Sequence, residues 1–167
     1  MKFYMFDYIE QILNEVDPAL MKGASVTPAG PTLFKVNDDA VKLSIDVADQ
    51  FQRSVAQLLF FSKRARPDMQ TAVAFLCTRV LSPDVDDLKR HLRATIFLPL
   101  CLGWDGTGHI YWSVDASFGV HPDMKSHTGG VMYLGTGAVI SMSTKQKLNT
   151  TSSTEAELVW GKRQPRI

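Results

Sequence analysis

Apolar residues recur with two different periods along this chain, and the change of period divides it into two parts. Up to about residue 93 they recur every three or four positions, which is typical of helices with one buried face. After residue 98 they alternate with polar residues, which is typical of strands with one buried face. The pattern therefore predicts an α+β fold, with a helical segment first, then antiparallel strands and one short helix.

Proline- and glycine-rich stretches divide the helical part further. Residues 22–45 contain several Gly and Pro residues and no periodic apolar signal, so they are predicted to be a linker. The predicted organisation is an N-terminal helix in 1–21, this linker, a helical region in 46–95 and a strand-rich region in 96–167. Within these regions the apolar spacing predicts helices over 3–16, 46–64, 67–80 and 84–93.

Three neighbouring strands are predicted in the strand-rich region, over 109–117, 129–135 and 137–144. In the first of them Ile110, Trp112 and Val114 alternate with polar residues, so Asp115 points away from the more apolar face. A Gly-Thr-Gly triplet at 135–137 joins the second and third strands as a hairpin.

A further strand is predicted over 98–104, where apolar and polar residues alternate weakly. It meets the turn signal Asp105-Gly106, so it is expected to form a hairpin with 109–117.

The last predicted helix follows a run of capping residues at 150–154. Two overlapping capping-box patterns pair Ser152 with Glu155 and Thr154 with Glu157. From spacing alone, the two glutamates are ordinary helix-capping acids and Asp115 is an ordinary solvated strand residue.

Composition and charge restrict the function classes. The chain has 167 residues, 45% of them hydrophobic, which is enough for a buried core. Its 18 basic and 17 acidic residues leave a net charge of +1, so there is no global electrostatic case for nucleic-acid binding. Cys77 and Cys101 are expected to be small buried residues, consistent with an intracellular (cytoplasmic or nuclear) location. Asp7 and Glu10 interrupt the apolar N-terminus, so no signal peptide or membrane span is predicted.

Two basic clusters could contact the phosphates of a nucleic acid, although a solvated helix end is the better interpretation of each. The four histidines show no metal-ligand spacing, and His121 and His127 are expected to be exposed loop residues. The clusters are Lys63, Arg64 and Arg66, and Lys89, Arg90 and Arg93.

The motifs VDAS, SHTGG and STKQKLNTTSSTEAEL, in that order around an apolar hairpin, resemble the ribonuclease H segment of copia-type LTR retrotransposon polyproteins. The upstream stretch LLFFSKRARPDMQTAVAFLCTRVLSPDVDD resembles the helical end of the reverse transcriptase region of the same polyproteins. The resemblance implies that Asp115 and Glu157, with Glu155 as the neighbouring alternative, descend from carboxylates that bind metal. It also implies Mg²⁺ as the metal and RNA in an RNA/DNA hybrid as the substrate.

The same resemblance predicts an incomplete ribonuclease H-like fold without turnover. The residues after Leu158 contain no acid, so a chain that leaves its ancestral reading frame or is cut short near Val159 is expected, with at most weak Mg²⁺ and hybrid binding. The strand that covers one side of 109–117 in this family is not in the sequence. Unless 98–104 covers that side, an exposed strand edge and self-association are expected. The alternative is a non-catalytic module whose helices and hairpins serve packing or self-association.

Overall fold

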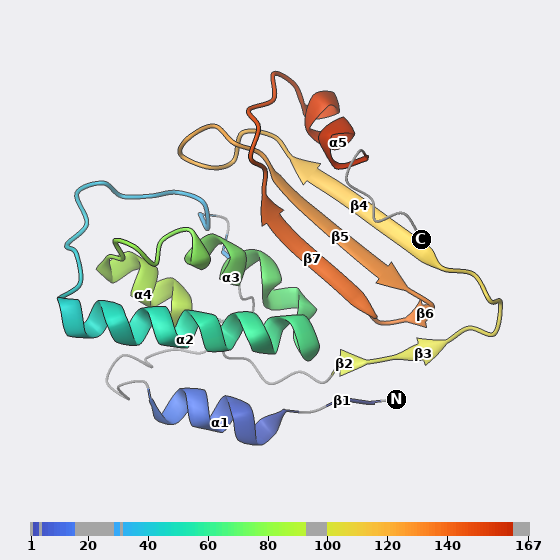
Figure 1. Ribbon diagram of the computed structural model, residues 1–167, viewed down its shortest axis with the longest axis horizontal. Helices are drawn as coiled ribbons and strands as arrows, with labels where there is room; N and C mark the ends of the chain where they lie inside the picture. The colour runs from blue at the N-terminus through green and yellow to red at the C-terminus, as the bar shows by residue number, and fades with distance from the viewer. Residues whose placement is uncertain (1, 4, 16–28, 31, 93–99, 162–167) are drawn as a thin grey trace.

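The chain passes through a group of helices before it enters the strands, so the predicted α+β class is confirmed (Figure 1). The structure is a computed structural model that describes residues 2–3, 5–15, 29–30, 32–92 and 100–161. Its α-helices are α1 (Phe6–Asn14), α2 (Ile45–Arg64), α3 (Gln70–Cys77), α4 (Val85–Leu92) and α5 (Ser153–Gly161), and a short 3-10 helix, η2 (Pro67–Met69), directly precedes α3. Its strands are β1 (Lys2–Phe3), β2 (Leu100–Cys101), β3 (Gly103–Trp104), β4 (Tyr111–Ser117), β5 (His127–Tyr133), β6 (Gly135–Thr136) and β7 (Ile140–Lys145).

Helix α2 is the centre of the helical core. Its apolar stripe packs between α1 and α3, and the cluster there includes Ile9, Ile12, Leu58, Met69 and Val73, all nearly inaccessible to solvent. The predicted helix over 46–64 is therefore confirmed, with its buried stripe, and the helices over 67–80 and 84–93 are confirmed with later starts or earlier ends.

Helix α1 is shorter than predicted, because Lys2 and Phe3 pair with β2 as a strand. Ile9 and Ile12 face the core, whereas Phe6 is 53% exposed. Val16, the predicted end of this helix, lies outside the described residues.

An ion-pair network fixes the start of α4. Asp84 and Asp87 are buried, and each carboxylate accepts a hydrogen bond from the backbone N–H of the other residue. Arg79 contacts both carboxylates at 3.0 and 3.1 Å, and Arg90 contacts Asp87 at 3.1 Å. Buried carboxylates need such partners, because an unpaired buried charge is strongly destabilising.

The main sheet contains three antiparallel strands in the order β4-β5-β7, so the predicted neighbours are confirmed. Asp115 of β4 lies opposite Gly129 of β5, and Gly129 lies opposite Ser143 of β7. The connection between β5 and β7 is longer than the predicted three-residue turn, and it contains the short strand β6.

The predicted hairpin between 98–104 and 109–117 is wrong. In the described part of this segment, β2 pairs with β1 and β3 pairs with β6, whereas β4 pairs with β5 alone. The Asp105 carboxylate accepts hydrogen bonds from the backbone N–H and the hydroxyl of Thr107, and Gly106 and Gly108 adopt positive φ. This local turn leads the chain into β4 in a direction that does not bring β3 and β4 side by side, so the two strands do not pair.

The two outer strands of the sheet present differently covered edges. Ser126 and Gln146 form the next pair of the β5–β7 ladder after His127 and Lys145, and the N–H of Gln146 donates to the carbonyl of Ser126 at 2.8 Å. This pair is therefore a hydrogen-bonded one. Because bonded and non-bonded pairs alternate in an antiparallel ladder, even-numbered residues of β5 bond to β7 and odd-numbered ones bond to β4. In β4 it follows that Trp112, Val114 and Ala116 direct their backbone groups outward.

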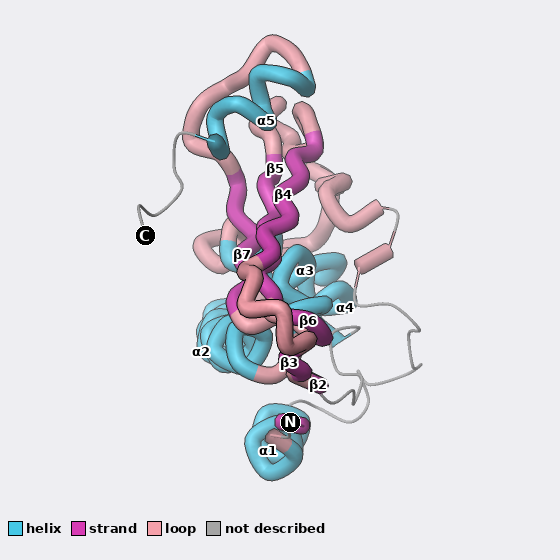
Figure 2. Tube along the Cα trace, turned by 90° about the vertical axis from the view of Figure 1, so that its right-hand side faces the viewer, coloured by secondary structure: helices cyan, strands magenta, loops and turns pink. Residues whose placement is uncertain are grey.

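Strand β7 is the covered edge. The Gln70 side chain of α3 donates hydrogen bonds to the outward carbonyl of Ser141, at 3.3 Å, and to its hydroxyl, at 2.7 Å. Strand β4 lies on the opposite side of the sheet, farthest from α2 and α3 (Figure 1). Figure 2 shows the strands nearly edge-on, with α5 toward one end of the sheet and α2, α3 and α4 toward the other. None of the helices in the described part of the chain has the length and apolar character that a bilayer crossing requires.

The core position of Leu58 is testable by truncation. We expect Leu58→Ala to lower the free energy of unfolding by about 3 kcal/mol, because it leaves a cavity between α1, α2 and α3. Leu81→Ala is the matched control, because Leu81 is 94% exposed and its truncation should change stability little. Urea unfolding of both variants measures the difference, and equal losses would contradict this packing.

Candidate functional site

Asp115 lies on β4, the strand predicted to carry it, and β4 is an outer strand of the main sheet. It is solvent-exposed, and its Oδ1 accepts a hydrogen bond from the backbone N–H of Ala116 at 2.8 Å. That N–H points toward the free edge of β4, so the carboxylate covers one of the edge donors.

Helix α5 carries the two candidate glutamates, also as predicted. The Ser152 hydroxyl accepts a hydrogen bond from the Glu155 N–H at 3.2 Å, which confirms that half of the predicted capping box. Glu155 reaches back to Thr151, accepting from its N–H at 2.7 Å and from its hydroxyl at 2.8 Å. These hydrogen bonds, chiefly the one from the backbone, hold the pKa of Glu155 below its usual value. Glu157, two residues further on, is exposed.

Asp115 and α5 belong to opposite faces of the sheet. Cross-strand partners share a face, and Ser143, in register with Asp115 through Gly129, contacts Thr71 of α3. Thr128 lies on the other face, and there Gln146 donates to both the Thr128 hydroxyl and the Ala156 carbonyl of α5. Asp115 therefore projects from the α3 face, whereas α5 packs on the other face through the buried Ala156.

The donor set of these acids fits a Mg²⁺ ion poorly. Asp115 and Glu155 are each engaged with backbone N–H groups of their own segment. Within the described ranges, no three His, Cys, Asp or Glu side chains gather as metal ligands would. For Asp115 and Glu157 to share an ion, the Asp115 carboxylate would have to leave Ala116 and Glu157 would have to reach around the edge of β4. Joint ligation by these two residues remains a prediction.

His121 and His127 are buried, so the prediction that they are exposed loop residues is wrong. They are only 2% and 6% exposed, and their rings lie 5.2 Å apart between centroids. Phe34 packs against both rings, and Phe75 of α3 packs against His121. Sequence reasoning missed this burial because it depends on aromatic residues distant in the chain.

A chain of hydrogen bonds connects the two histidines to α3. His121 Nε2 lies 3.0 Å from His127 Nδ1, and His127 Nε2 lies 2.6 Å from the Ser143 hydroxyl. Ser143 in turn donates to the Thr71 hydroxyl at 3.2 Å. Burial lowers the pKa of both histidines to about 4. The imidazoles are therefore neutral at pH 7 and join the sheet to the helical core.

A third histidine, His91 of α4, is also buried. Its Nε2 lies 2.7 Å from the hydroxyl of Ser54, and burial lowers its pKa to about 4. The apolar spacing of the helix gave no sign of this polar contact in the core.

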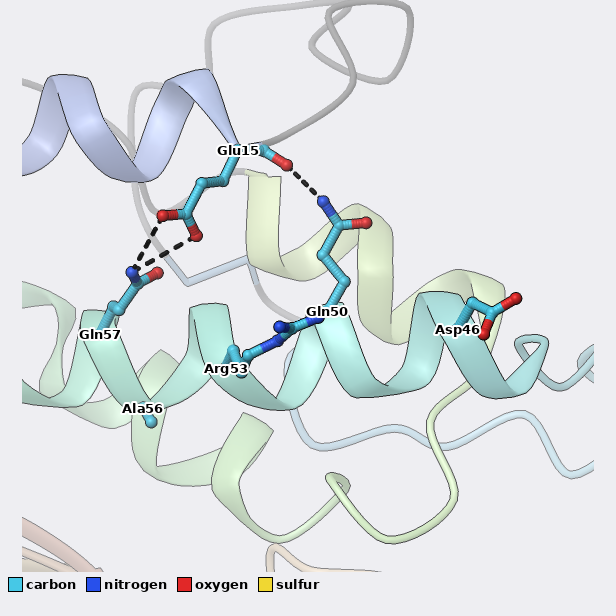
Figure 3. Close-up of a pocket in the computed structure, with 6 residues that line it drawn as sticks. All are labelled: Glu15, Asp46, Gln50, Arg53, Ala56 and Gln57. Carbon is cyan, nitrogen blue, oxygen red and sulfur yellow. Dashed lines mark hydrogen bonds between the residues drawn. The ribbon is translucent and has the colours of Figure 1, made fainter.

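Two surface hollows lie away from the candidate acids. The first, of about 600 Å³, lies beside α2 and is lined by Gln50, Arg53 and Gln57 among others. Figure 3 shows Glu15 between Gln50 and Gln57, and the Gln57 amide donates to the Glu15 carboxylate at 3.4 and 3.5 Å. The second, of about 620 Å³, follows β7 beside α2 and α3. The amide and charged side chains that line the hollow beside α2 indicate no particular reaction.

Each of the two basic clusters contains residues that are paired with acids of their own segment. Arg66 is buried rather than solvated, and it holds Asp68 through two nitrogens at 2.8 and 2.6 Å. The Arg64 guanidinium lies 3.6 Å from the centre of the Phe60 ring. In the second cluster Lys89 pairs with Asp86 and Arg90 with Asp87. Arg93 lies outside the described residues.

Comparison with known proteins finds two relatives. The chain is 30% identical over 157 residues to an uncharacterized mitochondrial protein of Arabidopsis thaliana, covering 90% of this chain and 63% of that protein. It is 31% identical over 117 residues to a protein of Saccharomyces cerevisiae named for the transposon Ty5-1, covering 65% of this chain and 38% of that protein. The chain thus spans less than two thirds of the length of either relative. No protein-family model matches the chain, and no solved structure matches it significantly.

The buried histidines predict a stability that depends on pH. Their folded pKa of about 4 lies below the ordinary value of 6.5, so they contribute full stability above pH 6.5 and lose it as the pH falls toward 4. We expect each to cost about 2 kcal/mol of unfolding free energy between about pH 7.5 and about pH 5. Urea unfolding at the two pH values measures the loss. His121→Phe should reduce it, and His109→Phe, at an exposed position, should not. An unfolding free energy that does not fall on acidification would contradict the presence of buried, neutral histidines.

Proposed function

We propose that this chain is a segment of a copia-type retrotransposon polyprotein. It would comprise the helical end of the reverse transcriptase region and the first half of a ribonuclease H domain. The similarity to a transposon-named protein over 117 residues supports the polyprotein origin. The observation that carries the finer assignment is the order of elements: three antiparallel strands, an aspartate on the first, and a helix with two acids that contacts that strand.

In this proposal Asp115 and Glu157, with Glu155 as the alternative, descend from metal ligands, but the chain on its own does not cleave RNA/DNA hybrids. Two-metal hydrolysis needs carboxylates that hold ions on both sides of the scissile phosphate. The described acids do not gather in that way. Asp115 and Glu157 would be the residues that hold Mg²⁺, and their positions on opposite faces of the sheet allow at most a weak site. We expect metal binding and hybrid binding to be weak.

A non-catalytic role is the second candidate, and two observations favour it. The Asp115 carboxylate already accepts a hydrogen bond from the Ala116 N–H at the edge of β4, and the Glu155 carboxylate already accepts one from the Thr151 N–H at the start of α5. Both acids then act in folding and association rather than in chemistry.

A cleavage assay with a matched variant tests the proposal. Purified chain is incubated with a labelled RNA/DNA hybrid in Mg²⁺ and, separately, in Mn²⁺, and the RNA strand is followed on a gel. We expect no cleavage by the wild type or by Asp115→Asn. Mg²⁺-dependent cleavage that Asp115→Asn abolishes would overturn the assignment of an inactive segment.

Mn²⁺ titration followed by NMR tests the inherited metal site separately. Paramagnetic broadening should reach the signals of both Asp115 and Glu157 at millimolar Mn²⁺, and Asp115→Asn should weaken it at both positions. Broadening at neither position, or at Glu157 alone in both proteins, would leave only the non-catalytic role.

A further inference from the structure

The outer edge of β4 presents backbone groups ready for another strand. In the part of the chain that the structure describes, β4 pairs with β5 alone, and the alternation of hydrogen bonds directs Trp112, Val114 and Ala116 outward. One of these outward donors, the Ala116 N–H, is covered by Asp115 at 2.8 Å.

The edge of β4 has few of the features that prevent the edge strands of natural proteins from pairing with other chains. Such edges are usually protected by proline, lysine or a bulge. The seven residues of β4 include neither proline nor lysine, and their register with β5 is continuous, without a bulge. Exposed apolar side chains lie along it, including Val114 at 37% and the flanking Ile110 at 57%. Asp115 is the one charged residue in the strand.

We propose that β4 pairs antiparallel with β4 of a second copy of this chain, with Val114 on the twofold axis. In this register every outward residue meets an outward residue, because Val114 meets its own copy and Trp112 meets the partner's Ala116. The apolar side chains of these three positions lie on one face. The strand is thus complementary to itself, which is the requirement for a symmetric pair.

Asp115 controls this pairing. In the proposed register it lies opposite the partner's Ser113, whose hydroxyl can donate to the carboxylate, and the two Asp115 side chains do not oppose each other. Before pairing, however, the Asp115 carboxylate has to release the Ala116 N–H, which then donates to the partner's Trp112 carbonyl. The hydrogen bond within the chain therefore competes with the one between chains and limits the affinity of the pair.

Sedimentation velocity of the full chain, without nucleic acid or metal, tests the interface independently of the proposed function. We expect the wild type to shift from monomer to dimer as the concentration rises into the range of tens of micromolar. Val114→Lys should remain monomeric, because it places like charges together on the twofold axis. Val131→Lys is the matched control, since Val131 is 36% exposed but lies on the central strand β5, and it should dimerise as the wild type does.

Three further variants distinguish the contribution of the backbone hydrogen bonds from that of the Asp115 side chain. Val114→Pro removes a donor that β5 does not use, so it should abolish the dimer while circular dichroism shows a folded chain. Asp115→Ala frees the Ala116 N–H and should tighten the dimer by roughly tenfold, whereas Asp115→Asn, which keeps an acceptor, should tighten it less. A wild type and Asp115→Ala that both stay monomeric would overturn the proposal. Association that persists in Val114→Lys, or that Val131→Lys abolishes as well, would overturn it too.

Discussion

The arrangement of this molecule depends on the register of β5 between its two neighbours. Odd-numbered residues of β5 bond to β4 and even-numbered ones to β7, and this alternation is continuous over both ladders. It decides that Asp115 projects from the α3 face and that Ala116 directs its N–H outward. It also places His127 on the α3 face, where Phe34 and Ser143 meet its ring. A slip of one residue would move every one of these side chains to the opposite face.

Contacts with α3 then make the two edges of the sheet unequal. Gln70 satisfies the outward carbonyl of Ser141, and Thr71 joins the hydrogen-bonded chain through Ser143 to the buried histidines. The β7 edge of the sheet is thus covered by the helical core, whereas the β4 edge has no strand or helix of the described residues bonded to it. At the β4 edge the Asp115 carboxylate accepts a hydrogen bond from the Ala116 N–H, a donor that has no ladder partner among the described residues. The family resemblance implies that Asp115 descends from a metal ligand, but the same residue is explained equally well as a cap on a backbone donor at the strand edge.

Local patterns were sufficient to predict the long elements but not the short or long-range ones. Helix α2 and strands β4, β5 and β7 follow from apolar periodicity, and Asp115 and Glu157 lie on the elements predicted for them. The two-residue strands β1, β2, β3 and β6 are too short to carry a period, so the hairpin expected over 98–104 was misplaced. The burial of His121 and His127 depends on Phe34 and Phe75, which no local pattern connects to them. Which face an acid occupies depends on register, and for this reason the sequence alone could not show that Asp115 and α5 lie on different faces.

Amide hydrogen exchange along β4 tests the central claim most directly, because it reads the alternation residue by residue. The measurement is made by NMR at a concentration where sedimentation shows a monomer. The amides of Ser113 and Asp115, which donate to β5, should exchange slowly, whereas those of Trp112 and Val114 should exchange at rates near those of exposed backbone. Ala116 should be intermediate, because Asp115 accepts its N–H. Slow exchange at Trp112 and Val114 together with fast exchange at Ser113 and Asp115 would contradict the register, and with it both the open edge and the position of Asp115.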